Sequence, residues 1–350
     1  MRLRHDVLEG FLGELYQAYG VSREEAEIVA RSQVESNLVG HDSHGVIKTA
    51  DYLARIEKGH IVPGAPFEVE TEGPTTAVVN GNWGFGFVVT DRAMRMAIEK
   101  ARATGVAGVT IRHQGHVGRL GAYTAMAAEA GLIAVMTADS GLGPKSVTPF
   151  GGRERRLGTN PISIAVPSGQ SGVVCIDMAT AAVASGKLQV AKARGEQVPA
   201  GWIVDSEGRG TTDPNAFYEG GALLPVGADQ GHKGYGLSFM VEVLSGLLTG
   251  LGFGIDPQGR HNDGCFIALF DVERFRPLAD LAADVDAFID FLKATEPAEG
   301  FTEILYPGEL EERRRRAGSL DGLEIDERTW DELARLAADK GVALPAEVSA

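Results

Sequence analysis

The chain has 350 residues, of which 33 are lysine or arginine and 48 are aspartate or glutamate, so its formal net charge at pH 7 is −15. This length exceeds that of a typical single domain and predicts one large domain or two smaller ones. The negative charge disfavours nucleic acid and anionic membrane surfaces as partners, because both repel an acidic protein.

The predicted elements begin with helices. Apolar residues recur at helical spacing from Phe11 to Tyr16, and the segment from Ser22 to Glu25 is a capping box that opens a second helix. From Phe67 to about residue 275, short β-like runs alternate with helical patterns, which indicates an α/β sheet. The remaining sequence is again helical. We therefore predict an α/β domain over residues 71–275 and a helical domain formed by residues 1–70 together with residues 276–350.

Several features favour a cytoplasmic protein without a membrane segment. The first 17 residues have helical apolar spacing rather than the continuous apolar region of a signal peptide. Cys175 and Cys265 lie far apart in apolar runs, which favours two buried thiols over a disulfide. The long apolar run from Gly234 to Ile255 contains Glu242 and several glycines, so it predicts a buried helix rather than a membrane span.

The usual dinucleotide fingerprint is missing. The nearest candidate, around Gly84 and Gly86, lacks the third glycine that permits close helix packing. No P-loop pattern is present either. A dinucleotide would therefore need other loops, and the glycine-containing segments at residues 116–123, 150–161 and 231–236 allow backbone to approach a ligand.

Two H-x-x-H pairs are candidates for chemistry, His41 with His44 and His113 with His116. Four histidine nitrogens can hold a metal ion, and a metal-dependent hydrolase is one interpretation. However, each pair lies beside glycine and lacks an accompanying H-E-x-x-H pattern. We favour no metal and instead expect one histidine of each pair to transfer protons, since the unperturbed pKa of histidine is about 6.5.

Polar residues continue after His44. The following sequence predicts a helix, which places Lys48 and Tyr52 at i+4 and i+8 on the same side as His44. Lys48 can hold a carboxylate while His44, oriented by Ser43, exchanges a proton with a neighbouring oxygen. The same spacing also fits ordinary surface residues with His44 as a helix cap, and spacing alone does not decide between the two.

Six segments occur in order along residues 43–250: SHGVIKTADYLARIEKG, HQGHVGRLGAY, PFGGRERRLGTNPISIAVP, CIDMATAAVASGK, VPAGWIVDSEGRGTTDP and GHKGYGLSFMVEVLSGLLTG. Together with the later YPGE, they resemble the malate/L-lactate dehydrogenase family, which also includes ureidoglycolate, sulfolactate and diketogulonate dehydrogenases and cyclic imine reductases. The resemblance implies an NAD(P)-dependent oxidoreductase with a central mixed-sheet, non-Rossmann NAD(P)-binding domain. It also implies a homodimer with the active site near the interface.

The resemblance assigns roles to individual residues. His44 is a proton donor or acceptor with Ser43 as its relay partner, His116 is a second acid/base candidate, and Thr159 contacts the substrate. The choice between the two histidines stays open. The cofactor contacts implied by the family are Val117, Gly118, Arg119, Leu120, Asp177, Met178, Ala179, Leu224, Pro225, His232, Lys233, Tyr306, Pro307 and Gly308.

One departure from the family pattern concerns the substrate. Where the family often has arginine, this chain has Lys48, a point charge that cannot make the planar guanidinium fork. Lys145 is a candidate second cation. We predict reversible hydride transfer between NAD or NADP and C2 of a small 2-hydroxy or 2-oxo acid of the malate, lactate or ureidoglycolate type. The alternative is reduction of a cyclic imine 2-carboxylate, in which the same acid protonates nitrogen.

Overall fold

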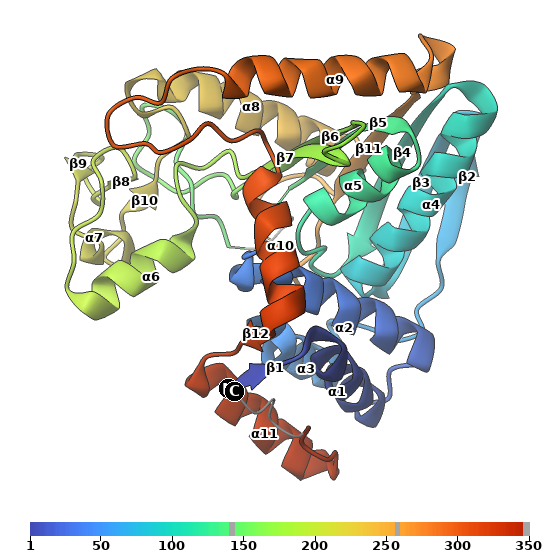
Figure 1. Ribbon diagram of the computed structural model, residues 1–350. Coiled ribbons are helices and arrows are strands. Elements are labelled where there is room, and N and C mark those ends of the chain that lie inside the picture. The colour runs from blue at the N-terminus through green and yellow to red at the C-terminus, as the bar shows by residue number, and fades with distance from the viewer. Residues whose placement is uncertain (140–143, 256–259, 346–350) are drawn as a thin grey trace.

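The computed structural model describes residues 1–139, 144–255 and 260–345. Within these ranges, seven strands form one mixed sheet at the centre of the molecule, in the order β2-β3-β4-β11-β5-β6-β7 (Figure 1). Strands β3 and β4 pair parallel, whereas the other neighbours pair antiparallel. This arrangement confirms the α/β class and the mixed sheet. The strands are β2 (Glu68–Glu72), β3 (Thr76–Gly84), β4 (Val106–Gln114), β5 (Leu132–Ala138), β6 (Ile162–Pro167), β7 (Val173–Met178) and β11 (Cys265–Asp271).

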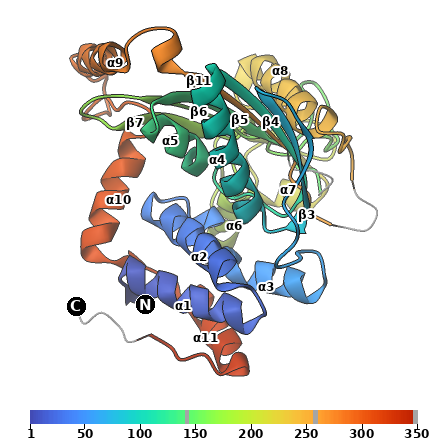
Figure 2. The same cartoon turned by 90° about the vertical axis from the view of Figure 1, so that its right-hand side faces the viewer.

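Helices α4 (Gly86–Thr104) and α5 (Gly121–Glu129) cover one face of this sheet (Figure 2). Residues of β4 alternate between buried and less buried, so Val109 and Ile111 point into the core against Met94 of α4. Burying such a side chain stabilises the fold by about 1.5–3 kcal/mol. The alternation therefore fixes which face of β4 packs on the helices, and with it the direction in which the chain leaves the strand.

The two ends of the chain build one helical layer below the sheet (Figure 1). Leu8 and Tyr16 of the first helix share a core with Leu333 of the last one. The predicted cap is present, because Ser22 Oγ accepts a hydrogen bond from Glu25 N at 3.3 Å. The elements of this layer are β1 (Arg2–Leu3), α1 (His5–Ala18), α2 (Arg23–Leu38), η1 (Asp42–His44), η2 (Val46–Lys48), α3 (Thr49–Glu57), α10 (Glu309–Asp321), β12 (Leu323–Glu324) and α11 (Glu327–Lys340).

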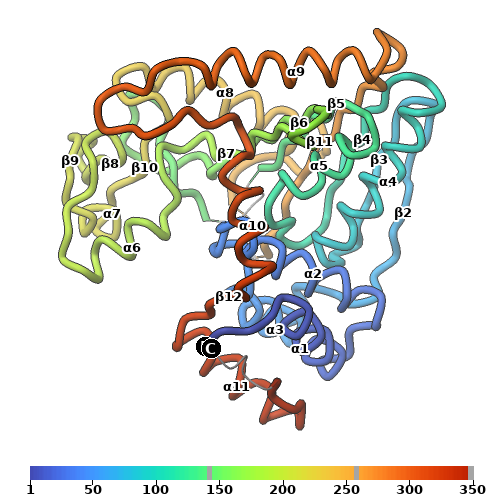
Figure 3. Tube along the Cα trace, in the orientation of Figure 1, coloured from blue at the N-terminus to red at the C-terminus, as the bar shows by residue number. Residues whose placement is uncertain are grey.

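Helix α9 (Leu278–Lys293) does not join this layer. It follows the short helix η5 (Val272–Arg274), lies along the far side of the sheet and contacts β6. The chain then makes a long excursion before it descends through α10 to the helical layer (Figure 3). The two-domain division at residues 70/71 and 275/276 stays a prediction.

A small lobe lies at the left of Figure 1. It has its own core around Leu188, Ile203 and Phe217. The sequence patterns did not separate this lobe from the α/β domain. Its elements are α6 (Ser185–Arg194), α7 (Asn215–Tyr218), and strands β8 (Ile203–Val204), β9 (Gly210–Thr211) and β10 (Ala222–Leu223), which pair in the order β10-β8-β9.

The apolar run from Gly234 forms a helix, but the expected full burial is wrong. After η3 (Ala228–Gln230), α8 (Gly231–Glu242) continues into the π-helical turn η4 (Val243–Leu247). Phe239 is 53% exposed and Phe253, beyond the turn, is 77% exposed. One side of this run therefore faces outward in the single chain. Within the described ranges, none of the helices combines the length and apolarity needed to cross a membrane.

Candidate active site

Three imidazole rings meet between the helical layer and the sheet. His44 ends η1, His116 follows β4, and His261 lies shortly before β11. The rings of His44 and His116 are nearly parallel, with centroids 5.3 Å apart and an interplanar angle of 10°. The ring of His261 meets that of His116 edge-on at 5.6 Å. Segments more than 200 residues apart in the sequence thus converge on one cluster.

The backbone around His44 is not the continuous helix that the spacing predicted. Two short 3-10 turns, η1 and η2, are separated by Gly45 in an extended conformation, and α3 begins only at Thr49. Asn37 of α2 holds this break, because its Oδ1 accepts a hydrogen bond from Val46 N at 2.9 Å. A Cβ at Gly45 would collide with the Asn37 side chain, so a larger residue there would displace Asn37. Ser43 is exposed.

Tyr52 is placed on His116 rather than in open space for a substrate. Its Oη lies 2.6 Å from His116 Nδ1, and the side chain is only 2% exposed, packed edge-on against Phe87. Burial raises the pKa of Tyr52 well above its usual value of 10, so the phenol stays neutral. A neutral hydroxyl can accept a hydrogen bond from Nδ1–H and leave Nε2 as the atom that exchanges a proton.

Both His44 and His116 are neutral at pH 7. Burial, with smaller contributions from His41 and Lys48, lowers the pKa of His44 to about 4. Burial also lowers the pKa of His116 well below 6.5, although Asp263 acts in the opposite direction. Lys48 lowers both values, which puts its ammonium within electrostatic range of both rings. A cation and two neutral bases therefore share one site.

The third histidine and its partner were missed in the sequence. His261 Nε2 lies 2.6 Å from Asp263 Oδ1. Burial would lower the pKa of His261, but Asp263 raises it above 6.5. Burial would raise the pKa of Asp263, but His261 holds it below 3.8. The H-x-D spacing directly before an apolar β-like run is the signal that could have indicated this pair.

The H-x-x-H pairs do not form a four-nitrogen site. His41 turns toward Glu311, with 3.4 Å between Nε2 and Oε1. His113 Nδ1 lies 3.1 Å from Asn80 Oδ1. Among the residues with described positions, no three histidine, cysteine or carboxylate side chains are grouped to hold a metal ion. The structure thus separates the two histidines of each H-x-x-H pair and brings His44 and His116 together.

Lys145 is buried rather than presented as an open second cation. Its Nζ lies 3.7 Å from Glu242 Oε1, and Glu242 also accepts a hydrogen bond from Asn160 Nδ2 at 2.8 Å. Burial, Asp263 and Glu242 raise the pKa of nearby Asp139 to about 7. Residues 140–143 of the same segment lie outside the described residues. Thr159, half-buried beside Asn160, accepts a backbone hydrogen bond from Thr180.

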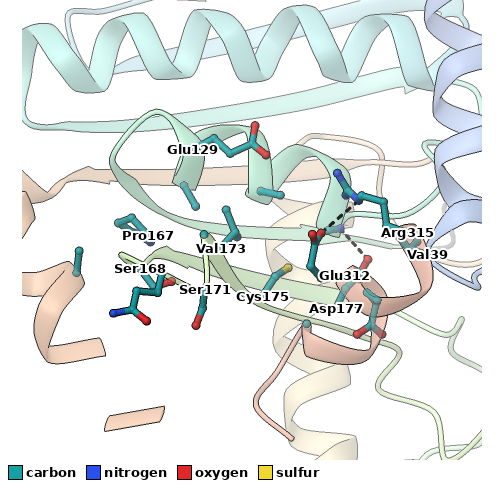
Figure 4. A pocket seen from close by; sticks show the side chains of 18 of the residues that line it. Val39, Glu129, Pro167, Ser168, Ser171, Val173, Cys175, Asp177, Glu312 and Arg315 are labelled. Carbon is teal, nitrogen blue, oxygen red and sulfur yellow. Dashed lines mark hydrogen bonds and ion pairs between the residues drawn. The ribbon is translucent and has the colours of Figure 1, made fainter. Parts of the chain in front are cut away.

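A cavity of about 670 Å³ lies next to this cluster, and His44 and His116 are not among its lining residues. Figure 4 shows Asp177, Glu312 and Arg315 at one end and Ser168 and Ser171 at the other. Arg119 also lines the cavity, and its charge makes a small contribution to lowering the pKa of His44.

The cavity brings together three of the expected cofactor residues, Arg119, Asp177 and Gly308. Asp177 Oδ2 accepts a hydrogen bond from Gly121 N at 2.7 Å. Gly308 has a φ of +93°, and a Cβ there would lie 3.2 Å from Cys175 N. Glycine therefore lets this segment approach β7.

Other expected cofactor residues do not line the cavity. Val117 and Leu120 are buried in the core of the sheet, so their contacts with a ligand would have to come from the backbone. His232 and Lys233 are exposed in the first turn of α8, where the His232 ring meets Phe150. The remaining members, also outside the cavity lining, are Gly118, Met178, Ala179, Leu224, Pro225, Tyr306 and Pro307.

Comparison with known proteins gives consistent matches over nearly the whole chain. A family model described as malate/L-lactate dehydrogenase matches residues 3–334. The chain is 36% identical to L-sulfolactate dehydrogenase of Methanothermobacter thermautotrophicus over 98% of both proteins. The solved sulfolactate dehydrogenase of Methanocaldococcus jannaschii superposes with a TM-score of 0.90, at 35% identity and 98% coverage of each chain. The Δ1-piperideine-2-carboxylate reductase of Pseudomonas syringae gives a TM-score of 0.85 at 30% identity, covering 96% of this chain and all of that one.

Proposed function

Because the chain belongs to the malate/L-lactate dehydrogenase family, we propose that this oxidoreductase transfers a hydride reversibly between NAD or NADP and C2 of a small 2-hydroxy or 2-oxo acid. The observation that carries this proposal is the convergence of His44, His116 and Lys48. A base and a fixed cation are what oxidation of a hydroxy acid requires. The base removes the hydroxyl proton and the cation holds the carboxylate.

We assign the proton transfer to His116 rather than to His44. Tyr52 holds Nδ1 of His116 at 2.6 Å, and this contact fixes the ring and presents Nε2 to the substrate. His44 has no such partner, since its buried Nδ1 makes no hydrogen bond within the described part of the chain. His44 then lies as a neutral ring parallel to His116, where it limits the approach of water to that face.

In the oxidation direction, Lys48 holds the carboxylate of the hydroxy acid and His116 Nε2 accepts the hydroxyl proton. A bound nicotinamide supplies the acceptor for the hydride. The imidazolium that forms keeps its Nδ1–H directed at Tyr52 Oη. In the reverse direction the same Nε2–H returns the proton to the carbonyl oxygen. Because the pKa of His116 is low, the ring is ready to act as a base at neutral pH.

We take the cavity beside the cluster as the cofactor site. Its volume of about 670 Å³ lies within the range of ligand sites, roughly 300–1,000 Å³. Arg119 is buried there, and its Nε makes no hydrogen bond within the described residues, so it has donor capacity for a phosphate or ribose oxygen. Arg119, Asp177 and the backbone of Gly308 would hold the cofactor. The proposal includes both NAD and NADP as cofactors.

Exposed apolar side chains on α8 and α9 support a homodimer with the active site near the interface. Phe239 and Phe253 near α8, and Phe288 and Phe291 of α9, are each more than half exposed. Asn160, which is buried shortly before β6, donates a hydrogen bond to Ser238 O of α8, so this helix also contacts the interior.

Cys175 and Cys265 are free thiols, which supports the expected cytoplasmic location.

The test is an assay of reduced nicotinamide absorbance with purified protein. Malate, lactate, sulfolactate and ureidoglycolate are each offered with NAD and with NADP, and the corresponding 2-oxo acids with the reduced cofactors. We expect turnover with at least one acid. His116→Asn should lose turnover but still bind cofactor in calorimetry. Absence of turnover with every acid would overturn the proposal.

Reduction of a cyclic imine carboxylate is the second candidate, favoured by the similarity to the Pseudomonas syringae reductase. Lys48 would again hold the carboxylate, and the protonated ring of His116 would donate to nitrogen. Δ1-Piperideine-2-carboxylate in the same absorbance assay separates the two candidates. Faster turnover of the imine than of any 2-oxo acid would favour this second function.

A further inference from the structure

His261 and Asp263 form a buried ion pair directly beside His116. Asp263 is 4% exposed, and its Oδ1 lies 2.6 Å from His261 Nε2. Charge attraction and the close side-chain contact both favour the charged forms of the two residues. The other oxygen, Oδ2, accepts a hydrogen bond from Val117 N at 3.0 Å.

The backbone around Asp263 is clamped to the strand end that carries His116. Asp263 N donates to Gln114 O at 3.3 Å, and Gln114 Nε2 donates to Asp263 O at 3.2 Å. Gln114 N in turn donates to Asn262 Oδ1. These bonds fix the carboxylate relative to His116, so its distance from the ring does not depend on a flexible loop.

Several charged and titratable groups surround His116. Burial disfavours a proton on His116 most strongly; Asp263 favours one, whereas His44, His261 and Lys48 disfavour it. Tyr52 stays neutral and adds a hydrogen bond but no charge. An unpaired carboxylate within about 4–6 Å of an imidazole favours its charged form, typically by 1–3 pKa units. His261 is the cation in direct contact with that carboxylate.

We propose that His261 is a positioning residue whose imidazolium cancels the charge of Asp263 beside His116, so that burial can keep His116 neutral and able to accept the substrate proton. This inference rests on the proposed function and names a residue that controls its base. His261 and Asp263 together are electrically neutral, so they add structure around His116 without fixing a proton on it.

The two members of the pair have unequal effects when they are removed. His261→Gln leaves Asp263 charged and unpaired, which raises the pKa of His116 by about 1 unit or more. Asp263→Asn removes the carboxylate that favours the protonated form of His261. His261 then becomes neutral, so both charges disappear together. The pKa of His116 therefore changes much less. In the double variant it returns close to the wild-type value.

The test is a titration of His116 by NMR of the imidazole nitrogens in the full-length protein without substrate. His116→Asn identifies the resonance. We expect His261→Gln to shift the midpoint upward by about 1 unit or more and the double variant with Asp263→Asn to reverse most of that shift. His5→Gln, at the first residue of α1, is the matched control and should leave the midpoint unchanged. A midpoint that is unchanged or lower in His261→Gln overturns the inference.

A kinetic readout follows the same sign. Oxidation needs neutral His116, so kcat/KM is lost as the pH falls through the pKa of that ring. His261→Gln should move this loss to higher pH by about 1 unit, whereas a purely structural role would lower kcat/KM at all pH values equally. If His261→Gln does not fold, His261→Asn replaces it. If no acid is oxidised but the NMR shift appears, the charge pair stands and the proposed function fails.

Discussion

Removing the hydroxyl of Tyr52 tests the assignment of His116 most sharply. Tyr52→Phe keeps the ring that packs on Phe87 but leaves His116 Nδ1 without its partner at 2.6 Å. Losing a hydrogen bond to a buried partner costs roughly 1–3 kcal/mol. If this energy orients the imidazole in the transition state, kcat falls by about 10- to 100-fold. The KM for the acid should stay within about twofold, because Tyr52 contacts the histidine and not the substrate.

Tyr16→Phe is the matched control. Tyr16 is also fully buried, and its Oη donates a hydrogen bond to Gln33 Oε1 at 2.7 Å. Both variants should therefore lose a similar free energy of unfolding, about 1–2 kcal/mol by urea denaturation, but only Tyr52→Phe should lose kcat. Equal kcat in the two variants would refute the reasoning. A raised KM with unchanged kcat would instead indicate that Tyr52 contacts the substrate.

Three further predictions concern Lys48, the buried carboxyl of Asp139 and the exposed apolar side chains. Lys48→Ala should raise the KM for the acid at least tenfold with a smaller effect on kcat, and a wild-type KM across the acid panel would exclude Lys48 as the carboxylate anchor. The carboxyl of Asp139 has a pKa of about 7 in the folded protein and 3.8 in the unfolded chain. Protonated Asp139 therefore stabilises the fold below pH 3.8, and this stability is lost as the pH rises through about 7. In urea unfolding, Asp139→Asn should thus be more stable than wild type at pH 8, by at most about 4 kcal/mol, and nearly as stable as wild type at pH 4. Equal stability of the two proteins at both pH values would contradict the raised pKa. Light scattering should give twice the chain mass of 37.0 kDa for wild type and for the control variant Leu320→Glu, but the mass of a single chain for Phe291→Glu. A dimeric Phe291→Glu would place the interface elsewhere.

Local patterns predicted the elements that depend on neighbouring residues. The Ser22 cap and the alternation of strands and helices could both be read from spacing. The break at Gly45 could not, because it depends on Asn37 from a different helix. Spacing therefore predicted a continuous helix where the chain makes two short turns.

The candidate site was only partly predictable for the same reason. His44 and His116 were each identified, but no local pattern shows that their rings stack or that Tyr52 reaches His116. His261 enters through β11, which inserts between β4 and β5 from a distant part of the sequence. The expected burial of α8 failed because the apolar spacing of a segment does not show which of its side chains other elements cover.

The central claim is hydride transfer from C2 of a hydroxy acid. The direct measurement uses an accepted acid carrying deuterium at C2 and follows the isotope into the reduced nicotinamide by mass spectrometry. We predict one deuterium per reduced cofactor and slower turnover than with the unlabelled acid. Reduced cofactor without deuterium would contradict the account.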